Sequence, residues 1–264
     1  MDLQLAGRVA LVNAASRGLG RGIAEALAAQ GARLVISART QDDLGQAAAE
    51  IAAAHGAEVV AVVADVSAAG TAERLVGAAV ERFGGLDILV NNSGGPPGGT
   101  FDDFDDAAWQ HAFDLLLLNV IRMTRAALPY LRASDQGRIV NVASTSVKEP
   151  IPGLILSNTL RAGVVGLAKT LSLELAPDQV TVNNVLPGRI LTDRLRGPFR
   201  EPARIAGLDV DDLARAEVAA EVPLGRVGEP SDLAELVTFL CGRPASYLTG
   251  LSITVDGGRS RSVF

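Results

Sequence analysis

Short apolar runs alternate with amphipathic stretches along most of the chain. Continuous apolar runs of strand length indicate strands buried on both faces of a parallel sheet, whereas apolar residues recurring every three or four positions indicate helices. Strands are predicted at 9–12, 33–38, 58–64, 86–90, 138–143, 180–186 and 251–255. Helices are predicted at about 18–30, 40–54, 67–83, 105–131, 154–176 and 231–241, with Thr40, Ser67 and Ser231 as N-caps of three of them.

This alternation predicts an α/β fold: a doubly wound, Rossmann-like parallel sheet with helices on both faces. Because no linker rich in Pro, Gly or Ser splits the chain, residues 1–264 are expected to form a single dinucleotide-binding domain. Residues 192–223 are charged and interrupted by prolines, which favours a helical flap over the ligand site.

Two loops are expected at the carboxyl edge of this sheet, where open α/β sheets bind ligands. The stretch 91–100, NNSGGPPGGT, is too rich in Gly and Pro for regular structure. Near the start of the chain, Gly18, Gly20 and Gly22 follow the first strand and precede an Ala-rich helix. Such a turn presents free N–H groups and the positive end of the helix dipole to one point, which suits a phosphate. It matches only part of the dinucleotide fingerprint, so an ordinary turn also explains it.

Composition narrows the choice of partner. The chain is 48% hydrophobic, carries a net charge of −6 and has no basic block or run of membrane-spanning length. The N-terminal residues do not read as a signal peptide. Cys241 is the single cysteine, and only two histidines, His55 and His111, could serve a metal. We expect a cytoplasmic protein with a small-molecule partner, and no nucleic acid, membrane or metal.

Several linked motifs carry a resemblance that covers nearly the whole chain. The chain resembles the classical short-chain dehydrogenase/reductases, and within them the beta-ketoacyl carrier-protein reductases. The motifs are the turn Arg17–Gly20, Asp65-Val66, Asn91–Gly94, Asn119, Ser144, Pro187-Gly188 with Thr192, and Gly250–Gly258.

The resemblance implies a nicotinamide cofactor. The implied binding residues are Asn13, Ser16, Arg17, Gly18, Leu19, Gly20, Arg39, Asp65, Val66, Asn91, Ser93, Gly94, Arg161, Pro187, Gly188 and Thr192. One departure lies at the start of the turn, where Asn13-Ala14 replaces the family's Thr-Gly. Because alanine tolerates a positive φ poorly, the backbone there is expected to be either regular or slightly deformed.

Charge distinguishes the two nicotinamide cofactors. An acid at the end of the second strand suits NAD, whereas a 2′-phosphate needs cations. Here Arg39 follows that strand and Arg17 lies in the turn, so two guanidiniums could flank a phosphate. NADP(H) is predicted over NAD(H), although Arg39 could also be a solvated surface residue.

The proton-handling pair departs from the family. The resemblance implies Asn119, Ser144 and a Tyr-x-x-x-Lys pair, but the alignment puts Ser157 at the tyrosine position and Arg161 at the lysine position. A serine hydroxyl is far less acidic than a phenol, and a guanidinium stays protonated. Neither Tyr130 nor Tyr247 is placed to substitute.

The sequence is compatible with three functions. The chain could be an oxidoreductase acting on a carbonyl or alcohol, with water, the substrate or Lys148, Glu149 or Asp193 carrying the proton. It could instead bind NADP(H) as a poor catalyst, acting as a sensor or as the silent subunit of a mixed oligomer. A lyase or isomerase on the same fold is the third alternative. Apolar residues among the arginines of the flap permit an apolar substrate with an acidic group, but a mobile lid would look the same.

The resemblance also implies a homo-oligomer. In the resembling family the helices predicted at 105–131 and 154–176 form dimer contacts, so Trp109 and Leu115–Leu118 are expected at the core or at a subunit contact. The closing segment 250–264 commonly joins a second interface there. We expect a tetramer, with a dimer as the alternative.

Overall fold

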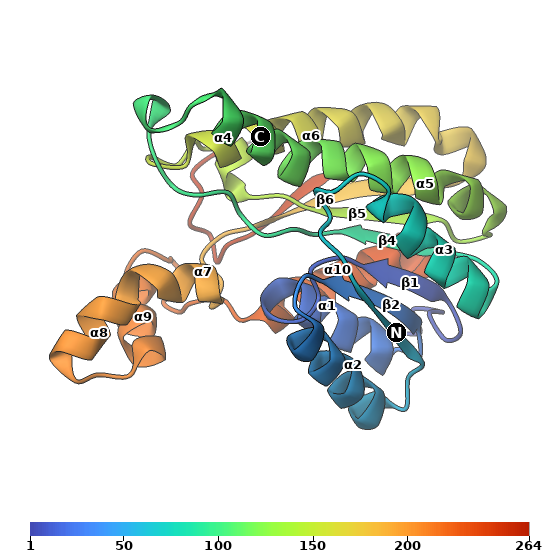
Figure 1. Ribbon diagram of the computed structural model, residues 1–264, viewed down its shortest axis with the longest axis horizontal. Coiled ribbons are helices and arrows are strands. Elements are labelled where there is room, and N and C mark those ends of the chain that lie inside the picture. The colour runs from blue at the N-terminus through green and yellow to red at the C-terminus, as the bar shows by residue number, and fades with distance from the viewer. Residues whose placement is uncertain (264) are drawn as a thin grey trace.

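The structure, a computed structural model, describes residues 1–263 and contains one seven-stranded sheet (Figure 1). All neighbouring strands pair in parallel, in the order β3-β2-β1-β4-β5-β6-β7. The strands are β1 (Val9–Val12), β2 (Arg33–Ala38), β3 (Val59–Val63), β4 (Ile88–Asn91), β5 (Arg138–Val142), β6 (Thr181–Pro187) and β7 (Ser252–Val255). The predicted α/β Rossmann-like sheet is confirmed, and its order reverses between β1 and β4, where such sheets bind ligands.

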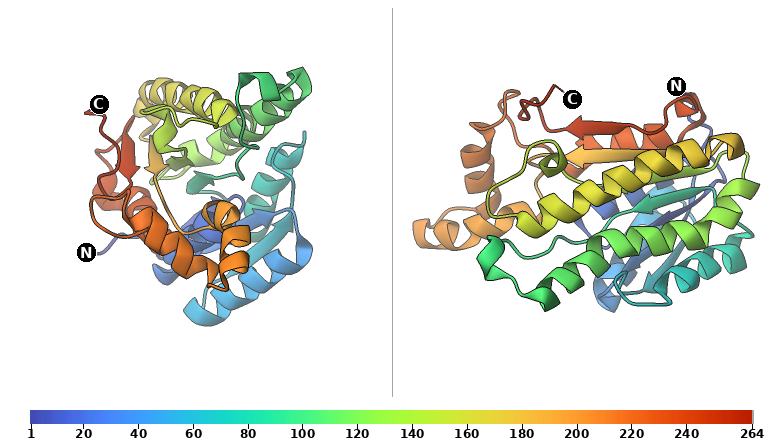
Figure 2. Two further views of the ribbon diagram at one scale, coloured as in Figure 1. Left: turned by 90° about the vertical axis from the view of Figure 1, so that its left-hand side faces the viewer. Right: turned by 90° about the horizontal axis from the view of Figure 1, so that it is seen from above.

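Helices cover both faces of the sheet and enclose two apolar cores. One face carries α1 (Gly18–Ala29), α2 (Gln41–His55) and α10 (Pro230–Cys241), and the other carries α3 (Thr71–Phe83), α5 (Asn119–Ala133) and α6 (Ile155–Glu174). Helices α5 and α6 run side by side, as Figure 2 shows from above. Strand β1 reads as an unbroken apolar run because all four of its residues are buried, whereas the edge strands β3 and β7 are mostly half-buried.

The helix expected over 105–131 is interrupted. Helix α4 (Asp106–Phe113) passes into a π-helical turn, Asp114–Leu118, before α5 begins at Asn119. The π turn places one extra residue in the helix, so the polar and apolar faces of α4 and α5 are rotated relative to each other. Trp109 and Leu115 pack within the chain, against a cluster that includes Leu116, Leu156 and Leu160.

The segment predicted as a flap contains three short helices that stand off from the rest of the molecule (Figures 1 and 2). They are α7 (Asp193–Arg196), α8 (Arg200–Ala206) and α9 (Val210–Ala219). A small apolar cluster of Leu191, Ala214, Val218, Val222 and Val227 holds the segment together. The large apolar side chains of Ile205 and Leu208 are exposed.

Two predicted helix starts are wrong, and both have local causes. Helix α3 begins at Thr71 rather than after Ser67, because the Asp65 carboxylate accepts hydrogen bonds from the Ser67 amide and hydroxyl and holds Ser67 in a turn. Helix α10 begins at Pro230, with Glu229 rather than Ser231 as its N-cap, since proline suits the first helical position. Thr40 does cap α2 by position, although its side chain makes no capping hydrogen bond.

Within residues 1–263, none of the helices combines the length and apolar character needed to cross a bilayer. The same residues hold no group of three or more His, Cys, Asp or Glu side chains arranged for a metal ion. Burial raises the pKa of the Cys241 thiol to about 12, so it stays protonated. The segment expected at a second interface ends at Phe264, which lies outside the described residues.

Candidate active site at the carboxyl edge of the sheet

The turn between β1 and α1 depends on close backbone approach. A Cβ built on Gly20 would lie 2.2 Å from the carbonyl oxygen of Ala14, well inside van der Waals contact, so only glycine fits there. Gly18 has a φ of 58° and Ala14 a φ of 51°. Ala14 thus adopts the left-handed conformation despite its Cβ, at a cost of about 1 kcal/mol. The turn keeps its irregular backbone where the family's glycine is replaced.

The N-terminus of α1 is open to an anion. Arg17 occupies the N-cap position, but no side chain caps the helix and its first turn holds no acid. The first N–H groups and the helix dipole therefore face the turn without a partner side chain. The Arg17 guanidinium forms an ion pair with Asp193 on α7, with an Nη1–Oδ2 distance of 3.0 Å. The start of the flap is thereby linked to the turn.

Asn13 supports the turn from beneath. Its side chain is fully buried, and its Oδ1 accepts a hydrogen bond from the Ser37 hydroxyl at 3.1 Å. The Asn92 side chain donates to the Asn13 carbonyl oxygen at 3.2 Å. Asn13 Nδ2 has no partner among the described residues. Ser16, three positions further on, is half-buried.

The ends of β2 and β3 carry opposite charges. Arg39 is exposed directly after β2 and makes no ion pair within residues 1–263. Hydrogen bonds from Ser67 hold the pKa of the Asp65 carboxyl below its usual value, and the nearby charge of Arg39 adds to this effect. Val66 beside it is half-buried. The end of β2 therefore presents a cation rather than the carboxylate that suits an unphosphorylated ribose.

A row of buried amides crosses the sheet at the end of β4. Asn91 Nδ2 donates to Asn141 Oδ1 at 2.9 Å, and Asn141 Nδ2 donates to Asn184 Oδ1 at 3.0 Å. Asn91 Oδ1 is buried without a partner in the part of the chain that the structure describes. Ser93 and Gly94 continue from β4 into the loop, half-buried and exposed respectively.

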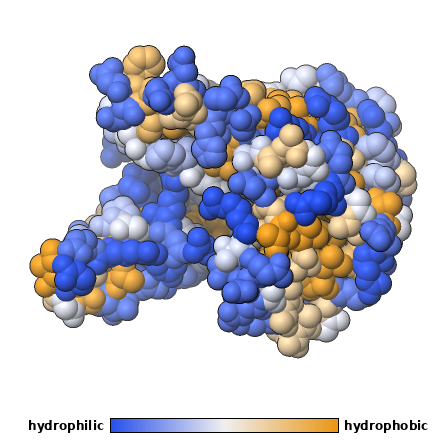
Figure 3. All heavy atoms as spheres, viewed as in Figure 1, coloured by the Kyte–Doolittle hydropathy of each residue, from blue (hydrophilic) through white to orange (hydrophobic). Residues whose placement is uncertain are grey.

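A cavity of about 500 Å³ opens between the turn, the loop after β4, α6 and the flap. Figure 3 shows a hollow with a largely hydrophilic surface between the flap and the rest of the molecule. The predicted residues that line the cavity are Leu19, Ser144, Ser157, Arg161, Pro187, Gly188 and Thr192. Those outside its wall are Asn13, Ser16, Arg17, Gly18, Gly20, Arg39, Asp65, Val66, Asn91, Ser93, Gly94 and Asn119.

Two hydroxyls face the cavity from neighbouring elements. Ser144 follows β5 and its Oγ accepts a hydrogen bond from the Ser146 amide at 3.1 Å, which leaves the hydroxyl hydrogen for a ligand. Ser157 lies in the first turn of α6 and is 5% exposed. Arg161 is four residues further along the helix and so lies on the same face as Ser157.

Arg161 carries a charge without a counterion. Its Nη1 donates to the Val142 carbonyl oxygen at 2.8 Å, and no carboxylate pairs with it within residues 1–263. Burial, together with the nearby charge of Arg194, lowers the pKa of Arg161 to about 10. The guanidinium nevertheless stays protonated at neutral pH.

Asn119 follows the π turn and has unused hydrogen-bonding capacity. Its side chain is 1% exposed, and its Nδ2 makes only a long contact of 3.5 Å with the Leu115 carbonyl oxygen. Its Oδ1 has no partner among the described residues. A buried amide oxygen without a partner suits an ordered water, and π turns are common at functional sites.

The cavity wall holds no tyrosine, lysine, histidine, cysteine or carboxylate among the described residues. The loops carrying the proposed alternative proton donors reach the cavity, but the donor side chains do not line it. The Asp193 carboxylate forms an ion pair with Arg17, and the Glu149 carboxylate accepts a hydrogen bond from the Arg261 amide. The side chains outside the wall are those of Lys148, Glu149, Asp193, Tyr130 and Tyr247.

Of the arginines that surround this cavity, sequence reasoning gave a role to Arg161 and mentioned those of the flap only as a group. Arg189 and Arg259 both pair with Glu221, at 3.0 and 3.4 Å. Arg194 pairs with no carboxylate in the described chain, and its Nη1 donates to the Pro96 carbonyl oxygen at 3.0 Å. The available signal was its place two positions after Thr192, which the resemblance had put at the cofactor.

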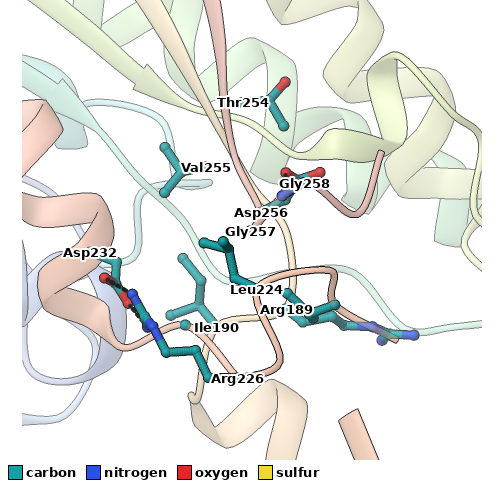
Figure 4. Close-up of a pocket in the computed structure, with 12 residues that line it drawn as sticks. Arg189, Ile190, Leu224, Arg226, Asp232, Thr254, Val255, Asp256, Gly257 and Gly258 are labelled. Atoms are coloured by element: carbon teal, nitrogen blue, oxygen red, sulfur yellow. Dashed lines mark hydrogen bonds and ion pairs between the residues drawn. The ribbon is translucent and has the colours of Figure 1, made fainter. Parts of the chain in front are cut away.

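A second, smaller cavity of about 280 Å³ lies beside the end of β7 (Figure 4). Its charges are satisfied internally. Arg226 makes two hydrogen bonds of 2.7 Å to the Asp232 carboxylate, and Asp256 accepts from the Gly258 and Ser260 amides. We therefore assign the candidate active site to the larger cavity.

A parallel sheet of this order, flanked by helices on both faces, is that of a Rossmann-like protein. The chain belongs to the short-chain dehydrogenase/reductase family: residues 13–260 match the family model described as enoyl-(acyl carrier protein) reductase. It is 34% identical to the 3-oxoacyl-(acyl-carrier-protein) reductase of Vibrio cholerae, over 97% of this chain and 98% of that protein.

Two solved structures are similar over essentially the full length. L-sorbose reductase from Gluconobacter frateurii, complexed with NADPH and L-sorbose, has a TM-score of 0.95 and 32% identity, covering 100% of both chains. An NADPH-bound short-chain oxidoreductase from Pseudomonas aeruginosa, described as containing an atypical catalytic center, has a TM-score of 0.89 and 32% identity. The alignment covers 98% of this chain and 99% of that one. The structural relatives are thus NADPH-binding oxidoreductases.

Proposed function

We propose that this chain is a single-domain NADP(H)-dependent oxidoreductase that acts on a carbonyl or alcohol and draws its proton from water. The observation that carries the proposal is the cavity itself. It lies at the switch point beside an open helix N-terminus, yet within residues 1–263 the polar side chains of its wall are only hydroxyls and guanidiniums. A phenol–amine pair is therefore not available to handle the proton there.

The described residues fit the cofactor. The uncapped N-terminus of α1 and its acid-free first turn would form a cradle for a pyrophosphate, and Gly20 lets the turn close tightly beneath them. Arg39 would hold a 2′-phosphate, Asp65 and Val66 the adenine, and Thr192 with Pro187-Gly188 the nicotinamide amide. Asn91, Ser93 and Gly94 would border the ribose. When bound, NADP(H) supplies or accepts the hydride.

The side chains of the cavity have separate roles. Ser144 and Ser157 would orient a carbonyl oxygen through their hydroxyl hydrogens, and the Arg161 guanidinium would stabilise negative charge on that oxygen. Reduction adds a hydride to the carbonyl carbon and a proton to its oxygen. Because no wall side chain gives up a proton readily near neutral pH, the proton comes from solvent water. Asn119 Oδ1, which has no partner in the described part of the chain, would accept a hydrogen bond from a water.

Cofactor choice is tested by binding. Titration followed by nucleotide fluorescence should give a Kd for NADPH at least tenfold lower than that for NADH, because Arg39 adds a charge-assisted contact to the phosphate. Arg39→Met should remove this difference and leave the NADH affinity unchanged. No binding of either nucleotide at millimolar concentration, or tighter binding of NADH, contradicts the proposal.

Turnover is tested separately by following NADPH absorbance with ketones, aldehydes and beta-ketoacyl thioesters. A Ser157→Tyr, Arg161→Lys double variant should gain rate if only the proton-handling pair distinguishes this site from its relatives. If NADPH binds tightly while neither wild type nor double variant turns over any compound, the second candidate is favoured. That candidate is a sensor or silent subunit, and the missing proton donor supports it.

The third alternative has less support. A lyase or isomerase needs a base to abstract a proton, and the wall of the cavity carries none among the described residues.

We also propose a homotetramer, with α5 and α6 forming one of its interfaces. Exposed Leu173 on α6 and almost fully exposed Tyr247 support an association surface. Sedimentation velocity distinguishes the tetramer from a dimer.

A further inference from the structure

The large cavity has an excess of positive charge. Arg161, Arg189, Arg194 and Arg259 all line it, and no Asp or Glu does so within residues 1–263. Glu221, outside the wall, pairs with Arg189 and with Arg259. The charges of Arg161 and Arg194 are left without a carboxylate, and each guanidinium makes one hydrogen bond, to a carbonyl oxygen.

These two charges are not needed by the cofactor's phosphates. In the proposed function, which this inference extends, the pyrophosphate lies at the N-terminus of α1 and the 2′-phosphate lies at Arg39. Arg194 comes instead from α7 of the flap and reaches the loop after β4 at Pro96. A guanidinium has five N–H donors, so both arginines retain donors for a ligand.

The loop after β4 is shaped to accept Arg194. A Cβ built on Gly95 would lie 1.9 Å from Arg194 Nη1, so the guanidinium occupies space that any larger residue would take. Apolar side chains complete the wall on either side, among them those of Ile151, Leu154 and Leu195. The cavity thus combines a fork that fits a carboxylate with room for an apolar body.

We propose that the substrate is an oxo acid or the corresponding hydroxy acid, with its carboxylate bound by Arg194 and its reacting oxygen facing Arg161 and Ser144. In the reducing direction the carbonyl carbon gains a hydride from NADPH, the C=O π pair becomes a lone pair on oxygen, and that oxygen takes a proton from water. The carboxylate is unchanged. It offsets the charge of Arg194, which a neutral ketone cannot do.

The test compares one compound with its neutral counterpart. Benzoylformate and methyl benzoylformate differ only in the charge and the methyl group of the acid end. Both are titrated by calorimetry against the protein saturated with NADP⁺, and against the protein alone. Wild type should bind the acid at least tenfold more tightly than the ester, because a charge-assisted bidentate contact is lost with the ester.

Variants locate the effect. Arg194→Met should remove the preference for the acid while leaving ester binding and the NADPH Kd unchanged. Gly95→Ala should weaken acid binding by displacing the guanidinium. Arg189→Met is the matched control, because it removes a cavity arginine whose charge is already paired, and it should keep the preference.

The outcomes separate this inference from the proposed function. Equal affinity for acid and ester, or an Arg194→Met variant that weakens both alike, overturns the inference even when NADPH binds. Failure of NADPH to bind overturns the proposed function. The titration of the protein alone then still decides whether Arg194 selects a carboxylate.

Discussion

The two ends of the large cavity are made of different parts of the chain. At the β1–α1 turn the proposed binding surface is backbone, namely the first N–H groups of α1, and Gly20 lets the Ala14 carbonyl pack closely against the helix. At the α6 end it is made of side chains, Ser157 and Arg161, and of Arg194 opposite them. The turn has a left-handed backbone at Ala14 although alanine carries a Cβ. By contrast, the α6 end of the wall offers neither a phenol nor an amine among residues 1–263. The turn end thus depends on backbone shape, whereas the α6 end depends on which side chains are present.

The largest expected effect concerns the backbone end. Gly20→Ala places a methyl group where the Ala14 carbonyl oxygen lies 2.2 Å away, so the turn must open. We expect the NADPH Kd to rise roughly 100-fold, since overpacking by one methyl costs about 1–3 kcal/mol and distorts the cradle itself. Gly45→Ala in α2 is the control, because nothing lies within 4 Å of its Cβ. It should bind NADPH normally and melt slightly higher. Unchanged NADPH affinity in Gly20→Ala would refute the idea that the backbone of this turn binds the cofactor.

The next effect concerns the side-chain end. Arg161→Met removes a guanidinium that has no carboxylate partner among residues 1–263. The methionine side chain replaces much of the apolar stem of the arginine. Turnover, or affinity for an oxo acid if turnover is absent, should fall about 10- to 100-fold. The melting temperature should stay level or rise, because an uncompensated buried charge is removed. A variant that loses stability and activity together would show that Arg161 is a structural residue.

A smaller effect should appear with pH. Burial lowers the pKa of Arg161 to about 10, so its charge is constant between pH 6 and 8.5 and wild-type binding of an oxo acid should be flat there. A lysine at this position starts from about 10.4 and, lowered by a similar amount, would titrate near pH 8. In Arg161→Lys, acid binding should therefore weaken as the pH rises through that value. A flat profile in this variant would contradict strong desolvation at the site.

Breaking the ion pair between the β1–α1 turn and the flap should have a weaker effect still. Arg17 of the turn pairs with Asp193 of the flap at a mostly exposed site. Asp193→Asn should free Arg17 and lower the NADPH Kd two- to fivefold at low salt, in keeping with about 0.2–1 kcal/mol for an exposed pair. The difference should shrink in 0.5 M NaCl because the charges are screened. Glu201→Gln breaks a similar pair with Arg204 on α8. It should change neither the NADPH Kd at low salt nor the NADPH Kd in 0.5 M NaCl.

The smallest effect is expected from a substitution at Ala14 in the turn. Ala14→Gly relieves a left-handed alanine but increases the entropy of the unfolded chain, so the two changes nearly cancel. The free energy of unfolding should shift by less than about 1 kcal/mol, and NADPH affinity by less than twofold. Urea denaturation and fluorescence titration measure the two quantities. A large gain in affinity would mean that the alanine deforms the cradle.

Much of this molecule could be predicted from the sequence because its signals are local. The strands at Val9–Val12 and Arg33–Ala38 have the predicted bounds, since runs buried on both faces need no distant information. The glycines of the first turn, the Ser144 loop and the placement of Ser157 and Arg161 one helical turn apart follow from spacing alone. The two wrong helix starts also have local causes, namely the Asp65 carboxylate and the ring of Pro230.

Other properties were decided only when distant segments met. The spacing of residues around Asn119 does not reveal the π turn before it, because helix type there depends on packing against α6. Counting arginines in the flap cannot tell which are paired. Among residues 1–263, the fold brings Glu221 to Arg189 and Arg259 but brings no carboxylate to Arg161 or Arg194. An ion pair depends on distances of a few ångströms between segments far apart in sequence, and only the tertiary structure sets those distances.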